Sequence, residues 1–345
     1  MKKALIVSPY LDHLGGGERY MLTCGCALES LGYEVSIGWD NLESVSNITK
    51  FLSIDLKNPV LDTKIKSLYH SASPLSMFLA TRPYDVVVYL SDGSIPLLGG
   101  KTNLLHMQVP FHNVGGKNLK NKLKLKTIKH VIVNSNFTKS IVDREYGFDS
   151  YVLYPPVPQN AKIQDKEKII LSVGRFEPSL NVKKQDVLIE AFKKLSGDLP
   201  EWKLVLVGGS VEDTWIEKLR NMASGYNIEI LPNAKYEELM DLYGRASIYW
   251  HAAGYGIDQT KSPELVEHFG ISTVEAISSH AIPLVYRAGG QTEIVKNQEL
   301  LWESEDELIT KTKNLTTKQF TDYERFLDIR EFTESAFISS LSRLL

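Results

Sequence analysis

Short apolar runs alternate with amphipathic stretches along most of the chain. Runs that are apolar at every position are typical of strands buried on both faces, as in a parallel sheet, and the stretches between them are typical of surface helices. Their repeated alternation indicates a doubly wound α/β architecture. In the first half, the pattern predicts a helix at residues 18–31 and strands at residues 4–8, 34–39, 85–90, 102–106 and 130–134.

A proline-rich segment interrupts this alternation. Residues 154–158 read Tyr-Pro-Pro-Val-Pro, and a polar stretch follows as far as residue 168, which predicts a stiff linker. The alternation then restarts. In the second half, it predicts helices at residues 187–195, 212–222, 237–243 and 271–279, and strands at residues 168–173, 203–207, 228–231, 247–251 and 282–286.

The 345 residues are therefore expected to form two Rossmann-like α/β domains, residues 1–157 and residues 165–330. A last amphipathic helix, residues 331–345, is expected to pack back across a domain. Ligands of open α/β sheets bind outside the carboxyl ends of the strands. Two such domains facing each other predict an active site in the cleft between them.

Composition narrows the class of function. The net charge is −3, so no global excess of positive charge favours a nucleic-acid partner. Cys24 and Cys26 lie in a helical pattern, where they suit packing in a reducing compartment better than a disulfide or a metal site. The first apolar run is too short for a signal peptide, and no window reaches the about 18 apolar residues of a membrane span. We therefore expect a cytoplasmic protein.

Glycines follow the first predicted strand, where Gly16 and Gly17 lead into a helix. Such a loop exposes backbone amides and a helix dipole that suit a phosphate, although a tight turn between strand and helix explains it as well. The dinucleotide fingerprint G-x-G-x-x-G would need a glycine at Tyr20, which disfavours an NAD-dependent oxidoreductase.

Cationic residues follow the first strand of the second half. Arg175 ends that strand, and Lys183 and Lys184 precede the next helix. At the carboxyl edge of a parallel sheet, these side chains are well placed to bind a diphosphate. Solvated surface lysines are the alternative.

The most informative motif is E-H-F-G-I-S-T-V-E-A, residues 267–276. Its two carboxylates, Glu267 and Glu275, flank a turn at Gly270 and the start of a helix at Ile271. Helical spacing puts residues 271 and 275 on one face, near the free amides of the first turn. An anion site flanked by two hydroxyl-binding carboxylates suits a sugar nucleotide. An isolated pair of this kind is also typical of a solvated helix face.

These motifs resemble family 4 (GT4) of the retaining glycosyltransferases, which have the GT-B fold and an E-x7-E motif. Residues 15–19, 133–139 and 154–157 resemble the same family, and its branch that mannosylates dolichol-linked oligosaccharides is especially similar. The resemblance runs nearly end to end. It implies an N-terminal acceptor-binding domain and a C-terminal domain that binds the nucleotide sugar.

The resemblance also implies roles for the motif residues. Glu267 resembles the glutamate near the hydroxyls of the transferred sugar, and Glu275 the one that binds the ribose. Phe269, Gly270 and Ile271 match the turn whose amides meet the sugar and the diphosphate. Their combined role would be donor binding.

Further roles are implied outside this motif. Arg175 and Lys183 resemble the pair that neutralises the leaving diphosphate, but the loop at residues 177–182 is longer than usual, which leaves Lys183 and Lys184 both open. Gly16 and Gly17 match the loop beneath the diphosphate and the acceptor. His106 resembles the histidine that lies against the donor sugar, whereas a lone histidine at a strand end is more often a buried, hydrogen-bonded residue. Residues 250–255 receive no role.

The implied reaction is transfer of a hexose, with mannose from GDP-mannose favoured, to a glycan or polyprenyl-linked acceptor in polysaccharide biosynthesis. No D-x-D motif is present, so neither a metal ion nor a cofactor besides the nucleotide sugar is expected. Two alternatives remain: a nucleotide-sugar 2-epimerase of the same fold, and a non-catalytic subunit of a transferase complex. The intact motif residues argue against the second.

A basic segment in the first half suggests where the acceptor binds. Lysines alternate with Leu119 and Leu123 in an acid-free run, which suits an anionic membrane surface and equally a solvated charged face. Lipid-linked acceptors in the resembling family favour peripheral binding at the inner face of the membrane. The lysines assigned to this surface are Lys120, Lys122, Lys124 and Lys126.

Overall fold

The computed structural model describes residues 1–11, 15–51, 54–69, 73–158, 162–177, 182–210 and 212–345. Parts of the predicted linker (159–161) and of the long loop after Arg175 (178–181) lie outside these residues. The chain divides into two compact units, the first made of Met1–Pro156 and Glu334–Leu345 and the second of Val157–Thr333. Each unit contains one parallel sheet with helices on its faces, which confirms the predicted α/β class.

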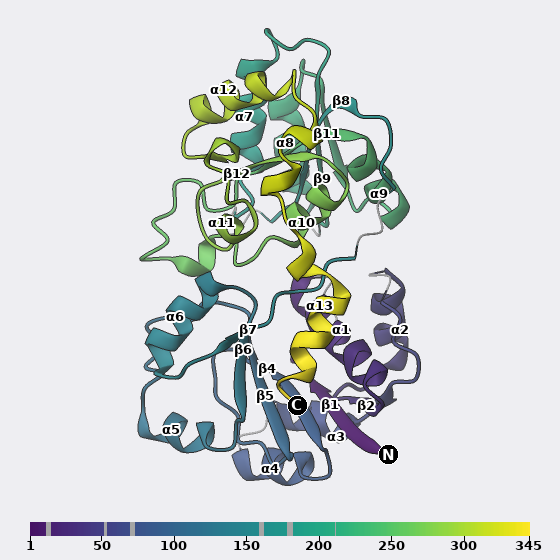
Figure 1. Cartoon of the computed structure of the whole chain (residues 1–345), viewed down its shortest axis with the longest axis vertical. Coiled ribbons are helices and arrows are strands. Elements are labelled where there is room, and N and C mark those ends of the chain that lie inside the picture. Colours follow the sequence, from purple (N-terminus) through teal and green to yellow (C-terminus); the bar gives the residue numbers. More distant parts are fainter. Residues whose placement is uncertain (12–14, 52–53, 70–72, 159–161, 178–181, 211) are drawn as a thin grey trace. The chain divides into compact units, whose positions relative to one another are not determined.

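The first unit is built on a seven-stranded sheet of order β3-β2-β1-β4-β5-β6-β7 (Figure 1). Every pairing is parallel, and the strand Val86–Leu90 is buried at all five positions, as its uninterrupted apolar sequence predicts. The strands are β1 Lys2–Val7, β2 Tyr33–Ile37, β3 Val60–Leu61, β4 Val86–Leu90, β5 Thr102–Met107, β6 His130–Val133 and β7 Tyr151–Val152. The helices are α1 Gly16–Ser30, α2 Leu42–Phe51, α3 Thr63–Tyr69, α4 Pro74–Thr81, α5 Leu119–Leu125, α6 Asn136–Tyr146 and α13 Glu334–Ser342.

The C-terminal helix α13 belongs to this first unit and contacts α1. Its buried Phe337 and Leu341 join the core, and the Phe337 ring meets the Tyr20 ring edge to face at 5.5 Å. The helix begins at Glu334 rather than at residue 331, because Arg330–Phe332 form a 3-10 turn. The Phe332 carbonyl of that turn accepts a hydrogen bond from the Val157 amide (2.8 Å), within the second unit.

The second unit is built on a six-stranded parallel sheet of order β10-β9-β8-β11-β12-β13. The central strand β8 lies between β9 and β11. From β8 the chain builds the sheet outward through β9 to β10, then crosses back to β11 and builds outward on the other side, so the strand order reverses between β8 and β11. Such a switch point leaves room for a ligand at the carboxyl ends of the two strands. The strands are β8 Glu167–Val173, β9 Lys203–Gly208, β10 Ile228–Pro232, β11 Ala246–His251, β12 Ile282–Tyr286 and β13 Leu301–Trp302. The helices are α7 Gln185–Leu195, α8 Asp213–Ala223, α9 Tyr236–Arg245, α10 Ile271–Ser278, α11 Gln291–Ile294 and α12 Glu305–Leu315.

Within the part of the chain that the structure describes, no helix combines the length and the apolar character needed to cross a membrane.

Candidate active site

The carboxylate of Glu267 is the centre of a polar cluster in the second unit. It lies on the loop between β11 and α10, and its side chain is 16% exposed. Lys183, from the loop before α7, places its Nζ 2.5 Å from Oε2, and His251, at the end of β11, places Nε2 3.0 Å from the same oxygen. The end of β11 and the loop before α7 therefore each bring a nitrogen to a single carboxylate oxygen.

The cluster determines the charge of Glu267. Burial alone would raise the pKa of its carboxyl, but the positive charge of Lys183 and the hydrogen bond from His251 outweigh that effect and hold the pKa well below its ordinary value. Burial lowers the pKa of His251, so its ring is neutral at neutral pH. The site thus combines a fixed carboxylate, an ammonium group and a neutral imidazole.

The turn after Glu267 brings the backbone to the start of α10. Gly270 has a φ of 112°, and a Cβ there would lie 2.9 Å from Oε1 of Gln291. Thr273 holds that amide by donating to the same Oε1 at 2.6 Å. Phe269 is 3% exposed, and its ring packs edge to face against that of Phe332, so its side chain belongs to the interior of the unit. The amides of Gly270 and Ile271 occupy the positive end of the helix dipole.

Glu275 lies one turn into α10. The Tyr243 hydroxyl donates to its Oε2 at 3.0 Å, and that hydroxyl also lies 3.3 Å from the Ser272 carbonyl oxygen. Tyr249, from β11, is fully buried with its hydroxyl 2.8 Å from the Ser272 hydroxyl. Burial raises the pKa of Tyr249, and the negative charges of Glu267 and Glu275 raise it further, so this phenol stays protonated.

A glycine pair after β12 supports the backbone of the same loop. Gly289 has a φ of 63°, and a Cβ there would lie only 2.0 Å from the Glu267 carbonyl oxygen. The Gly290 amide donates to that carbonyl at 2.8 Å, and a Cβ on Gly290 would lie 2.2 Å from the carbonyl oxygen of His268. The glycine pair was missed in the sequence, although two glycines after a buried strand were a usable signal.

Of the cationic residues predicted for this site, Lys183 alone is shown touching Glu267 among the described contacts. Arg175 follows β8 with an exposed side chain, and Lys184 starts α7 with a left-handed backbone (φ 54°). The side-chain Nε2 of Gln185 donates to the backbone carbonyls of Gly174 (3.2 Å) and Arg175 (3.0 Å), which holds the loop against the helix. The contact between Lys183 and Glu267 favours Lys183 over Lys184 as the residue that faces the cluster.

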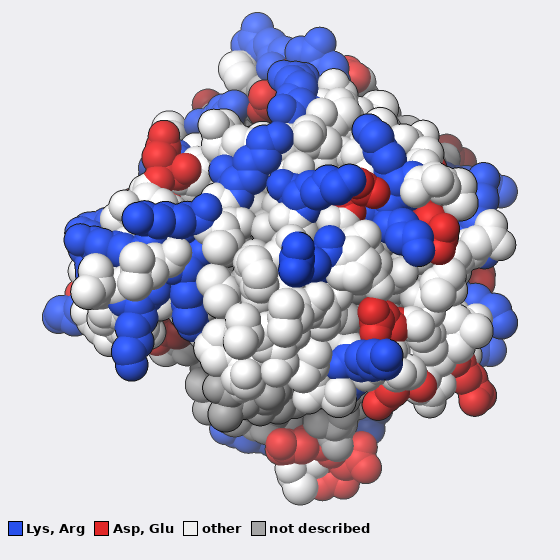
Figure 2. All heavy atoms as spheres, turned by 90° about the horizontal axis from the view of Figure 1, so that it is seen from below, with Lys and Arg blue, Asp and Glu red and all other residues white. Residues whose placement is uncertain are grey.

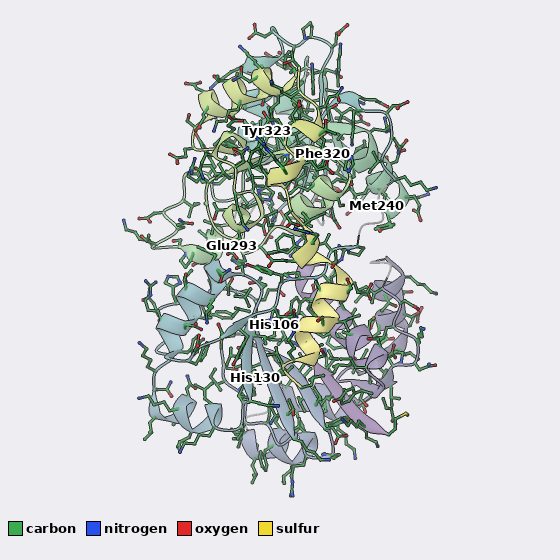
Figure 3. All side chains as sticks on the ribbon, in the orientation of Figure 1. His106, His130, Met240, Glu293, Phe320 and Tyr323 are labelled. Carbon is green, nitrogen blue, oxygen red and sulfur yellow. The ribbon has the colours of Figure 1, made fainter. Side chains whose placement is uncertain are left out.

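The predicted residues of the first unit lie at the carboxyl ends of β1 and β5. Gly16 opens α1, and a Cβ on Gly17 would lie 3.3 Å from Nε2 of Gln108. His106, labelled in Figure 3, is fully buried. Its ring stacks on that of Tyr20 at 3.9 Å, and its Nε2 lies 3.4 Å from Oε1 of Gln108. Burial lowers its pKa to about 4. The role of His106 beside the donor sugar stays a prediction, and its observed contacts are those of a buried, neutral histidine.

The basic segment forms α5, none of whose residues is buried. Leu119 is 73% and Leu123 54% exposed. Lys120, Lys122 and Lys126 are exposed, whereas Lys124 donates to the Ile95 carbonyl at 2.8 Å. Figure 2 views the protein from below relative to Figure 1. Lysine and arginine side chains gather on its left, the side on which α5 lies in Figure 1, with other side chains between them.

Comparison with known proteins gives matches of sequence and of fold. Residues 156–325 match the family described as Glycosyl transferases group 1. The GDP-Man:Man(3)GlcNAc(2)-PP-Dol alpha-1,2-mannosyltransferase of Dictyostelium discoideum is 28% identical over 50% of this chain, a match that covers 36% of that protein. The O-antigen chain mannosyltransferase RfbU of Salmonella typhimurium is 27% identical over 64% of this chain and 62% of its own length.

Among solved structures, HepE of Anabaena in complex with UDP and glucose has a similar fold, with a TM-score of 0.69 and 14% sequence identity. The match covers 99% of each chain. At this identity the likeness concerns the fold alone. The family match, residues 156–325, falls almost entirely on the unit that contains Glu267, and the fold match extends over both units.

Proposed function

Since this chain belongs to the group 1 (GT4) glycosyltransferases and has the GT-B fold, we propose that it transfers a hexose, with retention of configuration, from a nucleoside diphosphate sugar to a saccharide acceptor. The observation that carries the proposal is the cluster around Glu267. The Glu267 carboxylate, the Lys183 ammonium group and the first amides of α10 come from two loops that meet at Glu267. A sugar with an attached diphosphate requires such a combination of groups.

The proposed chemistry needs stabilisation of the negative charge that develops on the leaving diphosphate. Arg175, Lys183 and the first amides of α10 supply positive charge and donors that are preorganised for this purpose. Glu267 orients the transferred sugar through its hydroxyls, and Glu275 binds the ribose. The acceptor attacks from the side of the leaving group, and the departing phosphate takes its proton.

Lys183 forms an ion pair with Glu267. A bound diphosphate competes for that ammonium group, because an ammonium can donate to both but is drawn to the larger negative charge. We expect donor binding to weaken the ion pair. Glu267 would then be free to accept hydrogen bonds from the sugar.

For the donor, we propose GDP-mannose. Two relatives are named as mannosyltransferases, and the first of them is named for GDP-Man. The solved structure of HepE contains UDP and glucose instead, so UDP-sugars are the natural competitors in a test. A thermal-shift screen should give the largest increase in Tm with GDP-mannose or GDP. A larger increase with UDP-glucose or UDP would refute the choice of mannose but not the transferase assignment.

The acceptor assignment is tested by following nucleoside diphosphate release with and without a lipid-linked oligosaccharide. Release that depends on the acceptor supports transfer. Conversion of the donor sugar to another sugar without any acceptor would instead identify an epimerase.

For the acceptor side, we propose that α5 binds an anionic membrane surface that presents a lipid-linked saccharide. The exposed leucines and lysines of α5 supply apolar surface and charge, and α4 of the same unit exposes Leu75 (60%) and Leu79 (53%). Each lysine near an anionic surface contributes about 1 kcal/mol to binding. Loss of four lysines therefore predicts a drop in liposome affinity of more than about 100-fold.

The test is co-sedimentation with liposomes containing anionic lipid, at low and at moderate salt. Charge reversal of the three α5 lysines and of Lys126, which directly follows the helix, should abolish binding, and salt should weaken it in the wild type. A matched control reverses four exposed lysines of the second unit and should bind as the wild type does. Equal binding by both variants would refute the proposed surface. The α5 variant carries Glu at Lys120, Lys122, Lys124 and Lys126, and the control carries Glu at Lys218, Lys296, Lys313 and Lys318.

A further inference from the structure

His251, the last residue of β11, has both ring nitrogens engaged. Its side chain is 3% exposed. Nδ1 accepts a hydrogen bond from the Ala253 amide at 3.2 Å, and Nε2 lies 3.0 Å from Oε2 of Glu267. A backbone amide can only donate, so Nδ1 carries no proton. The proton of the neutral ring is therefore on Nε2, which donates to Glu267.

The backbone after β11 holds the imidazole in this tautomer. Ala252 and Ala253 are buried, and the Tyr255 amide donates to the Ala252 carbonyl at 3.0 Å, which closes the turn. The Tyr255 ring in turn contacts the rings of Tyr286 and Trp302 at 5.4 and 5.5 Å. Segment 250–255 thus acts as a rigid support for one side chain. Protonation of Nδ1 would place an N–H against the Ala253 amide, which opposes the charged form of the ring.

The two partners of Glu267 meet the same oxygen atom. Lys183 and His251 both bind Oε2, and within the described residues no hydrogen bond is shown to Oε1. The two partners differ in their other duties. Lys183 is on a loop and is assigned to the diphosphate as well as to Glu267. The His251 ring is buried, and no role in binding the diphosphate is assigned to it.

We propose that His251 is a positioning residue for Glu267, whose Nε2–H keeps the carboxylate oriented toward the donor sugar when Lys183 turns to the diphosphate. This inference rests on the proposed function. A glutamate side chain has three rotatable torsions, so loss of its last fixed partner would let it leave the productive orientation. The effect should appear in turnover rather than in binding of the nucleotide.

Three substitutions of His251 distinguish the effect of its hydrogen-bond donation from the effect of its side-chain volume. The amide nitrogen of Gln lies near the position of Nε2 and that of Asn near Nδ1, while Leu fills the site without any donor. We expect kcat to fall about 10- to 100-fold for His251→Leu and His251→Asn, as for loss of one hydrogen bond to a charged group. His251→Gln should recover most of that loss. Calorimetric Kd values for GDP and UDP should stay within about twofold of wild type in all three.

A double-mutant cycle identifies the route of the effect. If His251 acts through Glu267, adding His251→Leu to Glu267→Ala should change kcat by less than about twofold. The matched control is His130→Leu, on β6 of the first unit (His130 is labelled in Figure 3), where the His130 ring contacts the Tyr151 ring instead of Glu267. Its kcat should equal that of the wild type.

Full activity of both His251→Leu and His251→Asn, or additive losses in the cycle, would overturn the role of His251. A fall in GDP and UDP affinity equal to the fall in kcat would overturn it as well. Should His251→Leu fail to fold, the comparison of Gln with Asn decides. No turnover of any nucleotide sugar by the wild type would overturn the proposed function itself.

Discussion

Replacement of Glu275 by Ala separates the two carboxylates of the motif most sharply. In the proposed complex, Glu275 accepts hydrogen bonds from the ribose, which does not change during transfer. Its Oε2 accepts a hydrogen bond from the Tyr243 hydroxyl at 3.0 Å, and because a carboxylate offers about four lone-pair sites, it can accept a hydrogen bond from the nucleotide as well. Such a bond contributes about 1.5–3 kcal/mol, which corresponds to a Kd for nucleoside diphosphate about 10- to 100-fold higher in Glu275→Ala.

The same structure predicts that Glu275→Ala stays folded. The Tyr243 hydroxyl keeps an acceptor, because the Ser272 carbonyl oxygen lies 3.3 Å away. This hydroxyl therefore keeps a hydrogen-bond partner, and we expect a loss of less than about 1.5 kcal/mol in the free energy of unfolding. Tyr243→Phe removes the hydroxyl but leaves the carboxylate, so it should raise the Kd by less than about tenfold.

Glu267→Ala is the contrasting variant. It frees Lys183 from its ion pair, so diphosphate affinity should be unchanged or higher, whereas kcat should fall by about 100-fold or more because the transferred sugar loses its fixed carboxylate. Calorimetry with nucleoside diphosphate and donor-saturation kinetics distinguish the two variants. Glu217→Ala, on the exposed face of α8, is the matched control.

The result that would refute this reasoning is a wild-type Kd in Glu275→Ala together with a weakened Kd in Glu267→Ala. Normal nucleoside diphosphate binding and normal transfer in both variants would show that residues 267–276 do not form the donor site. Recovery of most of the rate of Glu275→Ala at high donor concentration is the expected signature of lost ground-state binding.

Three further predictions follow from the same cluster. Transfer should survive EDTA, because Arg175 and Lys183 are assigned to the charge of the diphosphate; loss of activity that magnesium or manganese restores would contradict this. The folded-state pKa of Glu267 is well below its ordinary value of 4.5, so its contribution to stability is present above that pH and lost as pH falls through the folded pKa. The difference in Tm between wild type and Glu267→Gln should therefore shrink below about pH 4.5, and a difference that grew on acidification would show the opposite sign of linkage. Gly289→Ala should destabilise the second unit by more than about 1 kcal/mol and impair turnover, because its Cβ meets the Glu267 carbonyl and its φ is positive; a wild-type melting curve would disprove that packing argument.

Much of the architecture could be read from the hydrophobic pattern. The prediction of a strand at residues 85–90 corresponds to β4, Val86–Leu90, because a strand covered on both faces must be apolar at every position. The glycine in the motif also indicated a turn, and Gly270 indeed has a φ of 112°, which other residues disfavour. Three strands escaped prediction: β3, β7 and β13 contain two residues each, too few to establish any period.

The sequence by itself determined which residue types were available for the site and which strand ends they follow. Only the tertiary structure decided which of them meet: Lys183 and Glu267 are 84 positions apart, and Tyr243 and Glu275 are 32 apart. His251 was passed over for the same reason, because its contact with Glu267 depends on the path of the loop after β11. A pattern of apolar positions reports that a side chain is buried but not what it is buried against. That partner depends on strand order and loop course, and both are settled by packing of the whole unit.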